Sequence, residues 1–215
     1  MLKEHQKQIV DCIMKKHGFV DYEVKPFKEC KSILRKLLWN QSWCDYRENG
    51  TTIIYLKENE FNKIEEIIVA AHEVSHAINY QNDVKRFRKL KFWSKINITS
   101  IIINVILPIL LSIASKDIQI NYLEVILFNI LVCIPTLLIH RYFITYKKDE
   151  NDTDIQAKKE LFSGLADKTM YKYIEKRISE RIDLVKGMHK KVLLASSLYS
   201  LLLLNSVLVT KYCLF

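Results

Sequence analysis

The chain has 215 residues and a formal net charge of +9, and 49% of its residues are hydrophobic. This length suits one domain, or one domain with a membrane anchor. No nucleic-acid-binding module accompanies the positive charge, so we expect no nucleic-acid partner. The five cysteines are odd in number and form no C-x-x-C pair, which argues against a disulfide framework and against a cysteine metal site.

The first 56 residues predict short helices and strands that pack into a small unit. In chain order these are a helix over 1–16 ended by Gly18, a strand over 19–24, a helix over 32–39 and a strand over 51–56. The turn signal Asn49-Gly50 precedes the last strand. That strand is either an edge to which an extended substrate pairs or an ordinary core strand, and the residues favour neither interpretation.

The next predicted helix, over 61–80, carries the motif H-E-x-x-H. His72 and His76 are one turn apart and project from one face, as two imidazole ligands of one zinc ion (Zn²⁺) require. Glu73 lies beside them, where it can take a proton from the attacking water and later deliver it to the leaving amine. The alternative is a pair of structural histidines, and the helical context argues against it.

Three long apolar segments predict membrane-spanning helices. They cover 98–115 and 118–140, which form a hairpin, and 192–210, and each is long enough to cross about 30 Å of hydrocarbon. Basic residues gather on one side of these segments, so the positive-inside rule places the loop at Lys116 outside the cell. We therefore expect a multi-pass protein of the inner (cytoplasmic) membrane, with the lipid bilayer as a partner and the active site facing the cytoplasm.

An acidic segment follows the hairpin and offers a third metal ligand. A helix starting here places Glu150 and Asp154 on one face with Ala157 and Leu161. Glu150 could complete a His-His-Glu site and leave a fourth zinc position open for water. Asp152 and Asp154 compete for this role, and an exposed acidic helix start is a further interpretation. Asp154 could instead accept the second N–H of a metal-bound imidazole.

Three further side chains are candidates for stabilising a developing oxyanion. They are Tyr80, His140 and Tyr146. Each is also typical of an anchor at a membrane interface. The residues alone do not decide between the two roles.

The order of these features resembles the YugP-type neutral zinc metallopeptidases, a family of bacterial membrane proteins. The matching stretches are Ala70 to Asn79 for A-A-H-E-x-G-H-A-I-Q, then the hairpin, Glu150 to Lys158 for E-x-x-A-S, and Gly187 to Leu193 before the last span. The resemblance extends from about Asp45 to Leu208 and implies Glu150 as the third ligand with Asp154 as a supporting group. A looser similarity to HtpX-type membrane proteases implies the same. Ser75 and Thr153 depart from the usual Gly and Ala, and the family's N-terminal span is missing.

Together these features predict a mainly α membrane protein with a zincin-like catalytic unit, a short upstream strand and three transmembrane helices. The expected parts are 1–96 (cytoplasmic catalytic part), 97–141 (transmembrane hairpin), 142–190 (cytoplasmic helical segment with the third ligand) and 191–215 (C-terminal transmembrane helix and tail). The predicted function is a zinc metalloendopeptidase that hydrolyses peptides or membrane proteins at the cytoplasmic membrane face. The alternative is a non-catalytic, membrane-anchored zinc-binding regulatory module. No oligomeric state is predicted.

Overall fold

The fold is described from a computed structural model of the chain. It describes residues 4–30, 42–57, 63–114, 122–165, 171–180 and 182–184, and the single residues 187, 191, 194, 198 and 202. The chain divides into two compact units. Unit 1 comprises Met1–Phe87 and Asp149–Asp183, and unit 2 comprises Arg88–Lys148 and Leu184–Phe215. Unit 1 therefore contains both the H-E-x-x-H motif and the acidic segment.

Unit 1 begins with helix α1 (Glu4–Lys16), whose apolar residues are buried along one face. Gly18 adopts a φ of 74°, a left-handed conformation that glycine accepts without steric cost. Its N–H donates to the Lys15 carbonyl at 3.1 Å, and the Phe19 N–H donates to the Met14 carbonyl at 3.0 Å. These two bonds satisfy two of the free carbonyls in the last turn of the helix. The predicted helix is confirmed over its described residues, and so is its end at Gly18.

A three-stranded sheet follows, made of β1 (Tyr22–Pro26), β2 (Trp43–Asp45) and β3 (Thr52–Leu56), with a 3₁₀ turn, η1 (Phe27–Glu29), after β1. The strand order is β1-β3-β2, with β1 parallel and β2 antiparallel to β3. The strand predicted over 51–56 is confirmed, but it lies in the centre and is buried throughout. The substrate-edge interpretation of this strand is therefore wrong, because both of its backbone ladders are occupied. The helix predicted over 32–39 lies outside the described residues.

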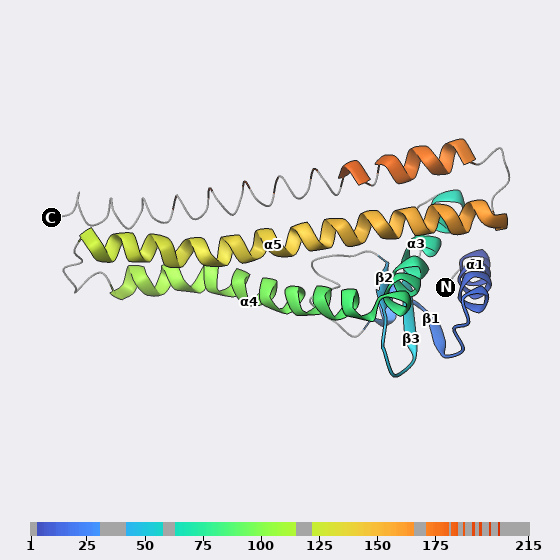
Figure 1. The fold of residues 1–215 in the computed structure, drawn as a ribbon, viewed down its shortest axis with the longest axis horizontal. Coiled ribbons are helices and arrows are strands. Elements are labelled where there is room, and N and C mark those ends of the chain that lie inside the picture. Colours follow the sequence, from blue (N-terminus) through green and yellow to red (C-terminus); the bar gives the residue numbers. More distant parts are fainter. Residues whose placement is uncertain are drawn as a thin grey trace. The chain divides into compact units, whose positions relative to one another are not determined.

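Helix α3 (Lys63–Asn82) carries the motif and packs against α1, β2 and β3 (Figure 1). Every residue from Ala70 to Ile78 is buried. A helix that is buried on all sides lies in the core, so its polar side chains need partners within the protein. The helix predicted here is confirmed over its described residues.

Two long helices complete the regular structure, α4 (Val84–Ala114) and α5 (Tyr122–Glu160), and α5 continues into a short π-helical turn, η2 (Leu161–Leu165). The prediction that a new helix starts in the acidic segment is wrong, because α5 runs through this segment without a break. No proline or glycine interrupts residues 141–160, and charged side chains are compatible with a helix interior.

The prediction of three transmembrane helices is wrong for the part of the chain that the structure describes. No helix there is both long enough and apolar enough to cross a bilayer. Residues 98–114 are instead the second half of α4, which begins with a strongly basic segment, and residues 122–140 are the first half of α5, which ends in a charged one. Of the third predicted span, only Leu194, Leu198 and Leu202 are described. The prediction of a multi-pass inner-membrane protein depended on these spans, so the structure contradicts it as well.

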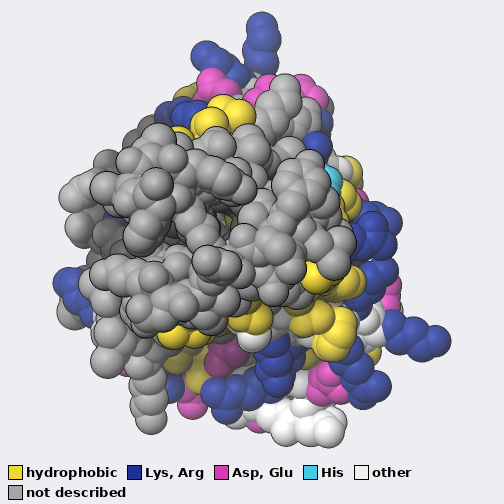
Figure 2. Space-filling view, turned by 90° about the vertical axis from the view of Figure 1, so that its left-hand side faces the viewer, with side chains coloured by type: hydrophobic (Ala, Val, Ile, Leu, Met, Phe, Trp, Pro, Cys, Tyr) yellow, Lys and Arg dark blue, Asp and Glu magenta, His cyan; other side chains and the backbone are white. Residues whose placement is uncertain are grey.

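Helix α4 nevertheless exposes large hydrophobic side chains, including Phe92, Ile98 and Ile106. Figure 2 shows hydrophobic side chains next to Lys and Arg on the described part of one face.

A buried carboxylate joins the end of α5 to the end of α1 within unit 1. The Glu160 side chain is 1% exposed, and Lys16 Nζ donates to its Oε2 at 2.8 Å. Gln156 Nε2 donates to Glu160 Oε1 at 2.8 Å, and His17 Nε2 lies 2.9 Å from the same oxygen. Burial acts to raise the pKa of Glu160, but Lys16 and His17 outweigh it and hold this pKa below its ordinary value.

We expect Glu160→Gln to lower the free energy of unfolding by about 1–3 kcal/mol at neutral pH, because the variant loses charge-assisted hydrogen bonds in a buried place. The folded pKa of Glu160 is depressed, so its stabilisation is present above the unfolded value of about 4.3 and is lost as the pH falls through the folded value. Urea unfolding at a series of pH values checks this. The variant and the natural protein should converge in acid.

Glu175→Gln is the matched control, since Glu175 is 63% exposed and pairs with Lys158 at the surface. Exposed pairs contribute little, so this change should leave the unfolding curve almost unaltered at every pH. A deficit of Glu160→Gln that stays constant down to acid pH would contradict the electrostatic explanation.

Candidate metal centre

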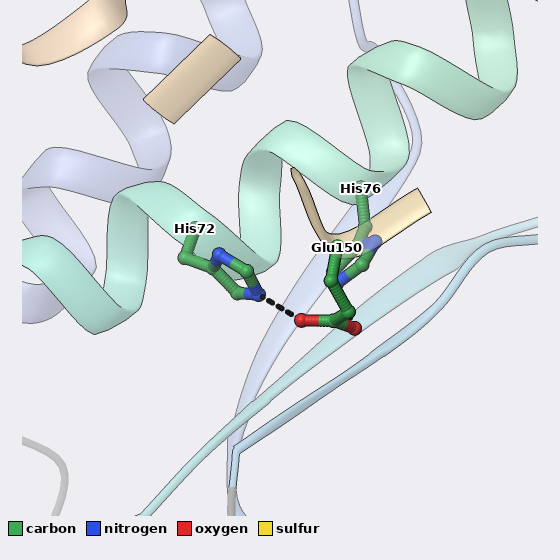
Figure 3. Close-up of side chains that lie close together, drawn as sticks. All are labelled: His72, His76 and Glu150. Atoms are coloured by element: carbon green, nitrogen blue, oxygen red, sulfur yellow. Dashed lines mark ion pairs between the residues drawn. The ribbon is translucent and has the colours of Figure 1, made fainter. Parts of the chain in front are cut away.

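Two histidines of α3 and one carboxylate of α5 converge in unit 1. The Glu150 carboxylate is turned toward the rings of His72 and His76 (Figure 3). His72 Nε2 lies 3.3 Å from Glu150 Oε2, and His76 Nε2 lies 3.5 Å from Glu150 Oε1. One ligand atom from each residue lies within 4.8 Å of the other two, and all three residues are buried. The three side chains could therefore hold one metal ion together.

The outer nitrogens of the two rings face further groups of α5. His72 Nδ1 lies 2.7 Å from Asp154 Oδ1. His76 Nδ1 lies 3.3 Å from Asp149 Oδ2 and 3.2 Å from Thr153 Oγ1. An Nδ1–H that donates to a carboxylate leaves the Nε2 lone pair free for a metal. Both imidazoles are therefore oriented so that their Nε2 atoms point at Glu150.

The spacing of these groups explains why one helix supplies them all. Asp149, Glu150, Thr153 and Asp154 are related by steps of one and four residues, which places them on one face of α5. All four are buried. That face lies against α3, which carries the histidines one turn apart.

The pKa values of Glu150 and His76 are shifted in the directions expected from their contacts. Burial acts to raise the pKa of Glu150, but His72 and His76 outweigh it and hold this pKa well below its ordinary range. Burial acts to lower the pKa of His76, whereas Asp149 and Glu150 raise it well above its ordinary value. The carboxylates therefore stay ionised, and a proton on His76 competes with a metal ion for the same site.

Glu73 follows His72 on α3 and is 7% exposed. On β2, burial and the Glu73 charge raise the pKa of the Cys44 thiol. Helix α3 packs against β2, which is one of the two edge strands among the described strands.

The three candidates for the third ligand are separated by their contacts. Only Glu150 lies among the Nε2 atoms. Asp154 faces the Nδ1 side of His72, as the alternative role for it required. Asp152 contacts Arg86 instead. Asp149 and Thr153, which contact His76, were not predicted, although their spacing from Glu150 and Asp154 was a usable signal.

The hydroxyl of Tyr80 lies on the Nδ1 side of His76. It donates to Asp149 Oδ2 at 2.7 Å. Burial, followed by the Asp149 charge, raises the pKa of Tyr80 well above its ordinary value, so the hydroxyl remains a donor. Tyr80 is thus a partner of Asp149, and nothing supports placing it at an oxyanion. His140 and Tyr146 belong to unit 2.

No family model, no curated protein and no solved structure matches this chain. The similarity to YugP-type and HtpX-type peptidases thus remains a prediction from the residues quoted for it.

Proposed function

We propose that the chain is a zinc-dependent peptidase, with His72, His76 and Glu150 as the metal ligands and Glu73 as the general base. The observation that carries the proposal is the convergence of both Nε2 atoms on the Glu150 carboxylate, at 3.3 and 3.5 Å. Ligand atoms about 2.0–2.2 Å from a tetrahedral zinc ion are roughly 3.3–3.6 Å apart. The two distances from the histidine Nε2 atoms to the Glu150 carboxylate fall in this range, which supports the proposal.

The donor set favours zinc over other common ions. Two imidazole nitrogens and one carboxylate are the ligands of many catalytic zinc sites, which keep a fourth position for water. Magnesium and calcium prefer sites made of oxygen ligands alone. The buried position of the three side chains also suits an ion that stays bound.

The proposed reaction is the hydrolysis of a peptide bond. A bound zinc ion supplies Lewis acidity, which activates water and polarises a carbonyl. Glu73 accepts a proton from the attacking water, the hydroxyl joins the carbonyl carbon, and Glu73 passes the proton to the amine nitrogen as the C–N bond breaks. Asp154 and Asp149 hold the rings of His72 and His76 through their Nδ1 atoms. No covalent intermediate with the protein is required.

The substrate class is inferred from the surroundings of Glu73. Glu73 belongs to α3, which packs against β2, a strand at one edge of the described sheet. An edge strand can pair with an extended peptide through backbone hydrogen bonds that depend little on sequence. This supports a peptide as the substrate.

A non-catalytic zinc-binding module is the second candidate. It is favoured by one observation: the metal ligands come from α3 and α5, which are far apart in the sequence, so a bound ion would tie the two helices together. This role requires the ligands but has no use for Glu73 as a base.

Removing the metal tests the proposal. We expect about one zinc ion per chain after gentle purification, because three protein ligands converge. A chelator should remove the zinc and abolish cleavage of a peptide library, and added zinc should restore both. Elemental analysis and mass spectrometry of the digest provide the two measurements. A fully loaded chain that cleaves no peptide would support the binding module instead.

A further inference from the structure

Arg86 lies in the first turn of α4, within unit 1. Its backbone N–H donates to Asp83 Oδ1 at 3.0 Å, so Asp83 caps the start of the helix. The Arg86 side chain is only 24% exposed. Its position is therefore set by a defined helix start and by the protein around it.

The guanidinium group contacts two carboxylates of α5. Arg86 Nε donates to Asp149 Oδ1 at 2.9 Å, and Nη2 lies 2.8 Å from the same oxygen. Nη2 also donates to the Asp149 carbonyl at 3.2 Å, and Nη1 donates to Asp152 Oδ2 at 2.8 Å. Such a fork of donors fixes a carboxylate in orientation as well as in place.

Asp149 contacts both Arg86 and the proposed metal ligand His76. While Oδ1 faces Arg86, Oδ2 accepts the Tyr80 hydroxyl at 2.7 Å and lies 3.3 Å from His76 Nδ1. The Asp149 side chain is only 2% exposed. An unbroken line of contacts therefore joins Arg86 to the His76 ring.

Arg86 also pairs with two of the carboxylates in the acidic segment of α5. Four carboxylates occur between residues 149 and 154, and they divide between the two histidines and Arg86. Asp154 faces His72 Nδ1, Glu150 faces both Nε2 atoms, and Arg86 engages the remaining two. Without the guanidinium group, Asp149 and Asp152 would lose their cationic partner beside two further carboxylates, Glu150 and Asp154.

We propose that Arg86 is a positioning residue of the metal centre. It holds Asp149 on the Nδ1 side of His76 and draws Asp152 aside, so that His76 presents Nε2 and Glu150 alone among the four carboxylates takes the ligand position. This inference rests on the metal centre of the proposed function and does not depend on peptide hydrolysis.

Metal affinity tests the role of Arg86. The chain is freed of metal with a chelator, and its affinities for zinc and cobalt(II) are measured by competition with a chromophoric chelator. We expect Arg86→Gln to weaken binding by about 10-fold, at the lower end of the roughly 10–100-fold typical of lost groups behind a ligand. Arg86→Lys keeps the charge without the fork and should lose less. Arg88→Gln, an exposed change of equal charge on the same helix, should bind as the natural protein does.

A double variant separates positioning from a general loss of structure. The test is made in a chain that also carries Asp152→Asn, which removes the contribution of Asp152. If Arg86 acts through Asp149 there, then Arg86→Gln combined with Asp149→Asn should bind zinc no more weakly than Asp149→Asn alone. Circular dichroism of the metal-free variants checks that they fold, and Arg86→Lys carries the test if Arg86→Gln does not fold. Additive losses, or equal affinities of Arg86→Gln and Arg88→Gln, would overturn the inference.

The zinc-affinity measurement tests the role of Arg86 whether or not the chain is a peptidase. Zinc binding with no peptide cleavage by the natural protein would end that proposal and leave this measurement intact. Normal zinc affinity in a folded Arg86→Gln chain that cleaves peptides would overturn only the role of Arg86.

Discussion

Glu150→Ala is expected to lower zinc affinity by more than the roughly 10–100-fold that losing a group behind a ligand costs, because it removes a ligand itself. Glu150 is the one carboxylate of the acidic segment that faces both Nε2 atoms. Alanine leaves two imidazoles without a third donor. Zinc occupancy after dialysis against a limiting chelator measures the effect.

Asp152→Ala is the matched control, since it removes a carboxylate from the same helix two residues away. Asp152 contacts Arg86 and is about one-third exposed, so its loss leaves the three ligand atoms in place. We expect nearly normal zinc occupancy in this variant. Equal occupancy in the two variants would show that Glu150 is not a ligand.

Features set by nearby residues were predictable from the sequence. The end of α1 follows from Gly18, whose left-handed backbone allows two bonds back to the helix. The pairing of His72 with His76 follows from the helical repeat, and the helix follows from its apolar spacing. In each case the cause lies within a few residues of its effect.

The third ligand could not be chosen from the sequence alone. Asp152, Asp154 and Glu150 are chemically similar, and only the packing of α5 on α3 decides which of them faces Nε2. The role of Asp149 depends on Arg86, which lies 63 residues earlier in the chain. Long-range packing of this kind leaves only a spacing pattern in the sequence.

Two other errors have different causes. Strand β2 (Trp43–Asp45) was not predicted, because three residues are too few to show a strand period; it pairs antiparallel with β3. The three predicted membrane spans rested on the length of apolar runs that contain few or no charged residues. In the structure the first two of those runs are parts of α4 and α5, and no described helix meets the requirements of a span.

Glu73→Gln is expected to keep zinc binding and to lower peptide hydrolysis by about 10²–10⁴-fold, which is the usual contribution of a general base. Glu73 is not among the three side chains that converge on the metal position, so the amide should leave the zinc affinity within a few-fold of its natural value. An amide cannot accept the proton that the attacking water must lose. Zinc occupancy and the initial rate of peptide cleavage are measured on the same preparation.

Glu66→Gln is the control, because it makes the same chemical change at a buried position of the same helix. Glu66 pairs with His5 of α1, so this variant should lose stability but keep its hydrolysis rate per folded molecule. A Glu73→Gln chain that hydrolyses peptides at the natural rate would refute the assigned base. Retained zinc with lost hydrolysis is the result that separates the two candidate functions, since a binding module that only ties α3 to α5 would not respond to the loss of a proton acceptor.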